Sequence, residues 1–282
     1  MRRIIILLLI LASAPLAADE PVRPVKRARY LEFARASADW TWNHYDSLVT
    51  SWKKSFDRES FFSFRPTSRM LEISKIYATL FKIEGKKEYS NRAKRVLLEY
   101  GDFREYYPEH IAARRPDYED GVPALPDFFK VMRYIRPYVI LSNNDMLTES
   151  EDTICRELIR ESMEYTMRTQ EWGPMNRSAL RAETAAWGIR ALPDTEEIDA
   201  WKTYEYATGF DNWGNWEIED ASHYHPIWLY SMLGYADAKN SLDDLFRTPE
   251  MYYYANYFLQ LMCPAGMIPD FGDGYWMSNW NR

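Results

Sequence analysis

Three segments of the chain combine amides, carboxylates, imidazoles, phenols and glycines closely enough to carry proton-transfer chemistry. The first, residues 171–177, reads EWGPMNR and leads into a predicted helix. Asn176 is either the cap of that helix or an amide that faces a cleft and, with Arg177, grips a carboxylate. Arg181 lies one turn beyond Arg177 and shares its face of the helix. The segment therefore predicts a helix start or an anion-binding site.

The second segment, residues 211–226, is the richest in groups that exchange protons. Pro226 suits the first turn of a helix, which puts the preceding residue at the mouth of that helix. A carboxylate, two imidazoles and a phenol occur within seven residues and form a plausible proton-transfer set. They are Glu219, His223, Tyr224 and His225. The pattern His-x-His is also found at metal sites, but no third ligand stands out, so we expect neither a metal nor another cofactor.

The third segment, residues 267–276, has two glycines around Asp273. Glycines there predict a tight turn, which either brings Asp273 and Tyr275 close to a ligand or simply reverses the chain. The chain is also dense in aromatics, with 11 Trp and 21 Tyr. Part of this set is expected in the core, and part offers stacking surfaces for sugar rings. The stacking candidates in the three segments are Trp172, Trp213 and Trp216.

Helices must position these segments, because apolar residues recur at helical spacing almost throughout. Such stripes indicate amphipathic helices that face a core. Examples are Tyr30, Phe33 and Trp40; Met70, Ile73, Tyr77 and Leu80; Ile154, Leu158 and Ile159; and Leu180, Thr184 and Trp187. Gly85 separates two helices, and residues 148–151 have the chemistry of a helix cap. We predict an all-α fold, an α/α toroid built as an incomplete barrel of helical hairpins.

The first 18 residues read as a secretory signal peptide. Arg2 and Arg3 precede a short apolar run at residues 4–11, and small residues follow. About a dozen apolar residues are too few to span a bilayer. We therefore expect export to the periplasm or the extracellular space, no membrane association after cleavage, and a single toroid domain over residues 19–282.

The net charge of the chain limits which ligands the protein can bind. The net charge of −7 becomes −9 once the leader removes Arg2 and Arg3, so nucleic acid is not expected as a ligand. An anionic substrate would have to meet a local cluster of arginines. The two cysteines, Cys155 and Cys263, lie in apolar helical surroundings, which favours buried thiols over a disulfide.

At the three segments the sequence resembles the helical-toroid polysaccharide lyases, a group that includes alginate, glucuronan and heparinase-type enzymes. The matching stretches are residues 171–177, 219–225 and 269–274, together with the helical spacing before them. The resemblance implies cleavage of a uronic acid polymer, of glucuronan or alginate type, by β-elimination. The product would carry an unsaturated uronic acid at its new end.

The resemblance also implies roles for individual residues. Asn176 corresponds to the asparagine that neutralises the substrate carboxylate, assisted by Arg177 or Glu219. His225 or His223 is the base or a second neutraliser. Tyr224 is the first candidate for the phenol that acts as acid, or as both base and acid. A phenol used as base needs cationic neighbours, because it titrates near pH 10 when unperturbed.

Related lyases continue beyond the third segment with further helices and often a β-sandwich domain. The resemblance therefore leads to the expectation that the reading frame is truncated after Arg282. Which uronic acid polymer is cleaved, whether cleavage is endo or exo, and the oligomeric state stay open.

Two alternatives use the same residues differently. A glycoside hydrolase on a similar toroid would pair Glu219 or Asp220 with Asp273 to activate water and protonate the leaving group. A secreted glycan-binding protein would use the tryptophans, including Trp276, without turnover. A lyase leaves a conjugated double bond, whereas neither alternative creates one.

Overall fold

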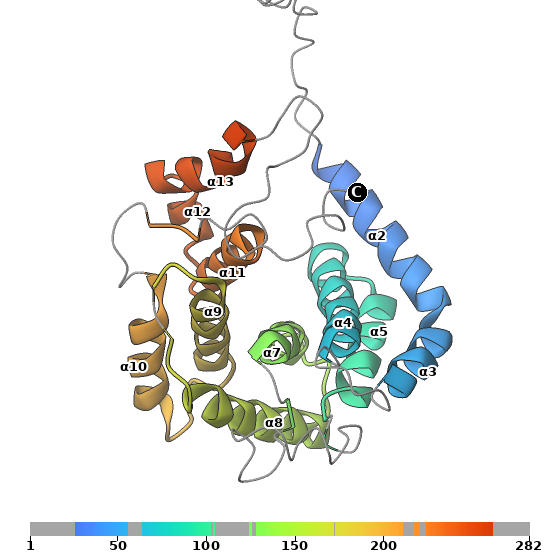
Figure 1. The fold of residues 1–282 in the computed structure, drawn as a ribbon. Helices are drawn as coiled ribbons and strands as arrows, with labels where there is room; N and C mark the ends of the chain where they lie inside the picture. The colour runs from blue at the N-terminus through green and yellow to red at the C-terminus, as the bar shows by residue number, and fades with distance from the viewer. Residues whose placement is uncertain are drawn as a thin grey trace, which may run out of the picture.

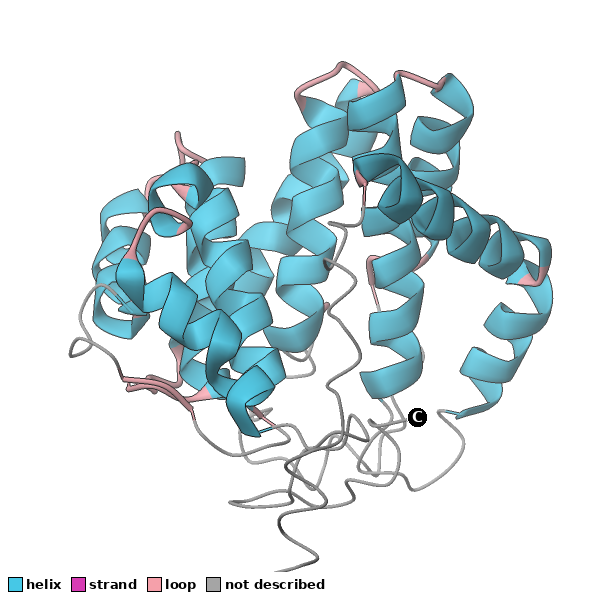
Figure 2. Ribbon diagram, turned by 90° about the horizontal axis from the view of Figure 1, so that it is seen from above, coloured by secondary structure: helices cyan, strands magenta, loops and turns pink. Residues whose placement is uncertain are grey.

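The protein is helical wherever its structure is described. The computed structural model describes residues 26–55, 64–102, 104, 124–125, 128–171, 173–210, 217–219 and 224–261. Within these ranges Figure 2 draws helices and loops and no strand. The predicted all-α class is confirmed. No helix in the described ranges combines the length and the apolar character needed to cross a bilayer.

The described helices are long and mostly joined by short connections. In chain order they are α2 (Arg27–Asn43), α3 (Tyr45–Ser55), α4 (Phe64–Glu84), α5 (Lys87–Glu99), α7 (Phe128–Ser142), α8 (Glu149–Met167), α9 (Asn176–Ala191), α10 (Ile198–Thr208), α11 (His225–Ala238), α12 (Leu242–Leu245) and α13 (Pro249–Leu261).

Four of these helices form an inner row. Helix α4 packs against α7, α7 against α9, and α9 against α11. Helices α5, α8 and α10 each pack on the inner helix that precedes them in the chain, so inner and outer helices alternate. Figure 1 shows the resulting arc, with α10 outside α9 and α5 outside α4. Such alternating hairpins are what an α/α toroid requires; closure into a toroid stays a prediction.

Helices α9 and α11 run in the same direction. Asn176, the first residue of α9, contacts Glu219, which lies just before α11. Further along, Glu183 lies against Gly234. Near the other end, Arg190 donates hydrogen bonds to the carbonyls of Asp237 and Ala238. Both helices therefore begin at the same end of the molecule, and segments that precede them meet there.

The local signals read from the sequence explain where several helices begin and end. Thr148 accepts a hydrogen bond from the Glu151 amide while the Glu151 carboxylate accepts one from the Thr148 amide, so the predicted cap is a full capping box. Gly85 ends α4 at a φ of 69°, a conformation that favours glycine. Pro226 lies in the first turn of α11, as predicted.

One predicted core-facing stripe is wrong. Tyr30, Phe33 and Trp40 on α2 are exposed by 63%, 75% and 59%. Helix α2 instead turns its other side to the core: Ala38 is buried, and Trp42 packs partly buried against the same cluster. The stripes on the other helices named above are buried except for Ile154, which is exposed. Two apolar stripes compete on α2, and the one that contains Leu31, Ala34, Ala38 and Trp42 packs against the core.

Cys155 is a free, buried thiol whose Sγ accepts a hydrogen bond from the Tyr134 hydroxyl at 3.2 Å. Burial raises its pKa to about 11. A thiol in this state is inert and behaves as a small apolar residue. The prediction of a buried thiol is confirmed for Cys155, whereas Cys263 lies outside the described residues.

Candidate functional site

A single carboxylate connects two of the segments that the sequence singled out. Glu219 accepts a hydrogen bond from the Asn176 backbone amide through Oε2 and a second from the Asn176 side chain, Nδ2 to Oε1, at 3.0 Å. Asn176 is 6% exposed and is the first residue of α9, and the cap position before it is Met175. Asn176 is therefore not the cap. Its amide is oriented by Glu219, and a second N–H on the same nitrogen is left to donate.

His225 lies on the other side of Glu219. Its Nδ1 is 2.7 Å from the Glu219 carbonyl oxygen, and its Nε2 is 3.3 Å from the Tyr254 carbonyl oxygen. The ring is 1% exposed and lies against Trp228 and Tyr257. The shorter contact fixes the backbone of Glu219. A neutral imidazole donates from one nitrogen only, so a role as base would require the nitrogen near the Tyr254 carbonyl to face the substrate instead.

The asparagine and the imidazole of the predicted site therefore both contact Glu219. Tyr224, directly before His225, is the cap residue of α11 and is partly buried. The chain separates Asn176 from Glu219 by 43 residues. Their convergence follows from the parallel course of α9 and α11, which brings both helix starts to one end.

Arg177 and Arg181 share a helix face, as predicted, and both bind the same carboxylate. Glu171 accepts from Arg177 at 2.8 Å and from Arg181 at 3.2 Å. Arg181 is buried and also donates to the Thr166 carbonyl, whereas Arg177 is half exposed. Arg181 therefore holds the segment before α9 in place, and Arg177 is the member of the pair that a ligand can reach.

Several predicted site residues lie outside the described residues, so the structure places none of them relative to Asn176. They are Trp172, Trp213, Trp216, Asp220, His223, Asp273, Tyr275 and Trp276. Three other tryptophans, Trp187, Trp201 and Trp228, are buried, in line with the expectation that part of the aromatic set lies in the core.

A second group of charged side chains, which the sequence reading missed, lies on the inner row of helices. Its most buried member is Glu183 on α9, which is 2% exposed. Burial raises the pKa of Glu183 to about 8, against the opposing effect of Lys75, Arg136 and Arg133. Its Oε2 makes no hydrogen bond to any part of the chain that the structure describes. Glu183 is therefore a largely uncharged acid at neutral pH.

Among the cations that lower the pKa of Glu183, Lys75 on α4 has the largest effect. Lys75 also contacts two other side chains. Its ammonium contacts the Glu72 carboxylate and the Tyr230 hydroxyl, and Nζ lies 4.7 Å from the centre of the Tyr230 ring. Glu72 also accepts from Arg133 at 3.1 Å. Burial lowers the pKa of Lys75. This group links α4 with α11, the first and last helices of the inner row.

One sequence signal could have found this group. Glu183 is the one acid in α9, where most of the other residues are small or apolar. A single acid in such a helix is either buried or functional. Its partners could not be read in the same way, because Lys75 and Tyr230 are 155 residues apart.

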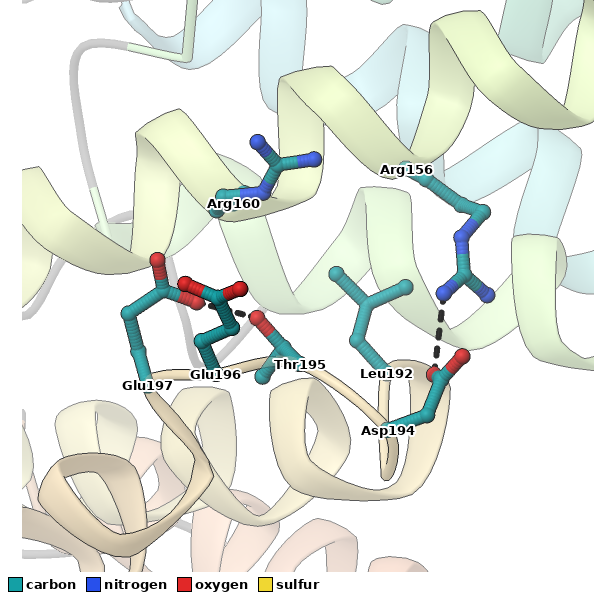
Figure 3. Close-up of a pocket in the computed structure, with 7 residues that line it drawn as sticks. All are labelled: Arg156, Arg160, Leu192, Asp194, Thr195, Glu196 and Glu197. Atoms are coloured by element: carbon teal, nitrogen blue, oxygen red, sulfur yellow. Dashed lines mark hydrogen bonds and ion pairs between the residues drawn. The ribbon is translucent and has the colours of Figure 1, made fainter.

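A surface hollow of about 360 Å³ lies elsewhere, between α8 and the connection from α9 to α10. Figure 3 shows its charged lining, in which Arg156 pairs with Asp194 at 2.9 Å and Thr195 donates to Glu197. None of the predicted site residues lines it. The pair of Arg156 and Asp194 is exposed, and exposed ion pairs of this kind contribute little to stability.

Among the described residues, no three His, Cys, Asp or Glu side chains gather as a metal ion would require. Comparison with known proteins adds no assignment: no protein-family model matches the chain, and no curated protein is significantly similar to it.

Proposed function

We propose that the protein is an exported polysaccharide lyase that cleaves an acidic polysaccharide by β-elimination. The substrate would be a uronic acid polymer of glucuronan or alginate type, and no cofactor would be needed. The observation that carries the proposal is that Glu219 binds Asn176 through its carboxylate and His225 through its backbone carbonyl. It supports a site in which an amide and an acid from separate parts of the chain act on one sugar.

The chemistry requires three tasks. The C5 proton of a uronic acid is hardly acidic while the neighbouring carboxylate is charged, so donors must neutralise that carboxylate as charge develops. Asn176 would donate its second N–H, and Glu219 would share a proton with the substrate carboxylate, because two carboxylates in contact cannot both stay ionised. Arg177 would add a positive charge at the exposed edge.

The remaining tasks are proton transfers. A base must remove the C5 proton, and an acid must protonate the departing C4 oxygen. A phenol of α11 would perform both when the two positions lie on the same side of the sugar ring. Tyr224 is the candidate at the start of α11. His225 would act by holding Glu219 in position.

The test is to incubate the mature protein with alginate, glucuronan, heparin and chondroitin and to follow the absorbance of new double bonds. Asn176→Ala should lower kcat on the active polymer by about 10²–10³-fold, the usual effect of removing one such donor. The matched control is Asn256→Ala, which removes an exposed amide on α13 that bonds to the Tyr252 carbonyl. This control should retain full activity.

Other outcomes would replace the proposal. New reducing ends without new absorbance would identify a glycoside hydrolase, in which a carboxylate such as Glu219 activates water. Retention on a polysaccharide matrix without any product would identify a glycan-binding protein. Full activity of Asn176→Ala would remove Asn176 from the site while leaving the reaction class in place.

A further inference from the structure

Two phenols on α11 could serve the proposed reaction, and they differ in their surroundings. Tyr224 lies at the start of the helix, whereas Tyr230 lies five residues beyond His225, about 7.5 Å along the helix axis. Tyr230 is 37% exposed, so a ligand can reach its ring and hydroxyl. A phenol acts as a base only in its ionised form, which needs a neighbouring cation. Tyr230 has one.

That cation is Lys75. Its ammonium contacts the Tyr230 hydroxyl from one side and lies near the face of the ring. Lys75 itself is 8% exposed and is held in place by Glu72, which also pairs with Arg133. A desolvated cation interacts more strongly with its neighbours than an exposed one. The lysine is therefore fixed behind the phenol, and the phenol is the outermost group of the set.

The charge state of this set depends on groups from all four inner helices. Glu72 on α4 lies against Lys75. Arg133 and Arg136 on α7 and Glu183 on α9 interact electrostatically with the same group of side chains. Arg136 is itself paired with Asp237 of α11 at 2.5 Å. Among these groups, the Lys75 ammonium is the one in contact with the Tyr230 hydroxyl, and this contact favours an ionised phenol.

We propose that Tyr230 is the phenol that exchanges protons with the substrate, and that Lys75 is the residue that positions and stabilises its ionised form. The inference rests on the proposed lyase function and assigns to Tyr230 the role that the sequence gave to Tyr224. Because C5 carries the carboxylate, one sugar would have its carboxylate at Asn176 and its C5 proton at the Tyr230 hydroxyl.

The step balances without any further reagent. The ionised Tyr230 oxygen takes the C5 proton, and the electron pair of the broken C5–H bond forms the C4–C5 double bond. The bond from C4 to the glycosidic oxygen breaks, and the proton passes from Tyr230 to that leaving oxygen. The phenol is then ionised again, and Lys75 keeps its proton throughout.

The activity test compares two lysine–tyrosine pairs whose tyrosines both lie on α11. Tyr230→Phe should lower kcat on the active polymer by about 10²-fold or more, as expected when a proton-transfer group is lost. Lys75→Met should move the acidic limb of the kcat/KM pH profile to higher pH, and Lys75→Arg should restore the original profile. The controls are Tyr235→Phe and Lys239→Met, because Lys239 donates to Tyr235 at 2.9 Å in a similar pair. Both controls should keep the wild-type profile.

Two activity results would overturn the inference while the lyase function stands: a folded Tyr230→Phe variant with full activity, or a Lys75→Met variant with lower activity and an unmoved pH profile. Loss of activity in Tyr224→Phe alone would return the role to Tyr224.

A second measurement does not depend on turnover. In protein labelled with ¹³C at the tyrosine Cζ, the Tyr230 resonance, assigned by its loss in Tyr230→Phe, should titrate at lower pH in the wild type than in Lys75→Met. If the wild type cleaves no polymer, the proposed function fails, and this titration alone tests whether Lys75 stabilises the ionised form of Tyr230. An identical Tyr230 titration in both proteins would overturn it.

Discussion

Two tyrosines of α11, Tyr230 and Tyr235, each contact a lysine, and a glutamate completes each group. The two groups are built in opposite ways. In the inner group, Lys75 is buried while Tyr230 and Glu72 are partly open to solvent. In the outer group, Tyr235 is buried and donates to Glu205, while Lys239 is exposed.

The same three residue types therefore form two groups that differ in which member is buried. The outer group has the arrangement that favours stability, with its apolar ring buried and its charge in water. The inner group has a desolvated ammonium behind a reachable hydroxyl, which costs stability. The inner group therefore suits the catalytic role proposed for Tyr230, and the outer group suits a structural role.

The largest effect is expected from the glycine that lets Glu183 approach α11. A Cβ added at Gly234 would lie 2.0 Å from Glu183 Oε1, and both residues are buried. Gly234→Ala should therefore lower the free energy of unfolding by about 3 kcal/mol, the upper end of the usual range for overpacking. Gly209 is the glycine that lies against the outer group, and a Cβ added there would lie 2.7 Å from the Tyr235 hydroxyl. Gly209→Ala should cost less in the same urea denaturation.

A double variant isolates the cause. Glu183→Ala removes the carboxyl that the new methyl group would meet, so Gly234→Ala should cost less in that background. Equal costs in both backgrounds would mean that the methyl group meets something other than Glu183.

The next effect concerns pH. Burial raises the pKa of Glu183 to about 8, so the folded protein keeps a proton that the unfolded chain releases above about pH 4.3. The associated stability is complete below that pH and is lost as pH rises toward 8. Relative to Glu183→Gln, the wild type should lose a few kcal/mol, to order of magnitude, between about pH 5 and pH 8. Thermal unfolding of both proteins across this range would measure it, and parallel curves would contradict a buried, protonated Glu183.

Tyr235→Phe should destabilise the protein more than Tyr230→Phe does, whereas Tyr230→Phe should have the larger effect on activity. Tyr235→Phe removes a buried hydroxyl that bonds to Glu205 and Lys239, and it should cost about 1 kcal/mol. Tyr230→Phe removes a hydroxyl at a partly exposed position and should cost less than about 0.5 kcal/mol. Urea denaturation of the two variants gives both values. A larger cost at Tyr230 would mean that the inner group is mainly structural.

The smallest effect is expected at Lys239, which pairs with Glu205 at 3.2 Å near the surface. Lys239→Met should change the free energy of unfolding by no more than about 0.5 kcal/mol, since exposed ion pairs contribute little. That difference should shrink further in 1 M salt, where screening acts over about 3 Å. A large effect that persists in salt would show that the outer lysine is as desolvated as the inner one.

The helical class and most helix limits follow from the sequence because they depend on near neighbours. Apolar spacing, the capping box at Thr148 and the glycine at Gly85 act within a few residues. The same rules failed on α2, where two apolar stripes compete and only packing decides which one is buried. Local pattern sets the type of an element, and tertiary contact sets its orientation.

The candidate site was predictable only in part, for the same reason. Asn176, Glu219, Tyr224 and His225 stand in unusual local sequences at helix starts, so they could be named. Lys75 and Tyr230 stand in ordinary helical sequence. What makes them notable is the contact between α4 and α11, which depends on the inner row of helices as a whole.

The shared direction of α9 and α11 has an electrostatic consequence. Aligned peptide groups give each helix start the equivalent of about half a positive charge. Because α9 and α11 begin at the same end, these partial charges add where Asn176 and His225 lie. The Glu219 carboxylate, which accepts a hydrogen bond from the first amide of α9, already meets part of this positive potential. Under the proposed function, the rest of the potential would favour the approach of an acidic polymer from that end, before any side chain binds it.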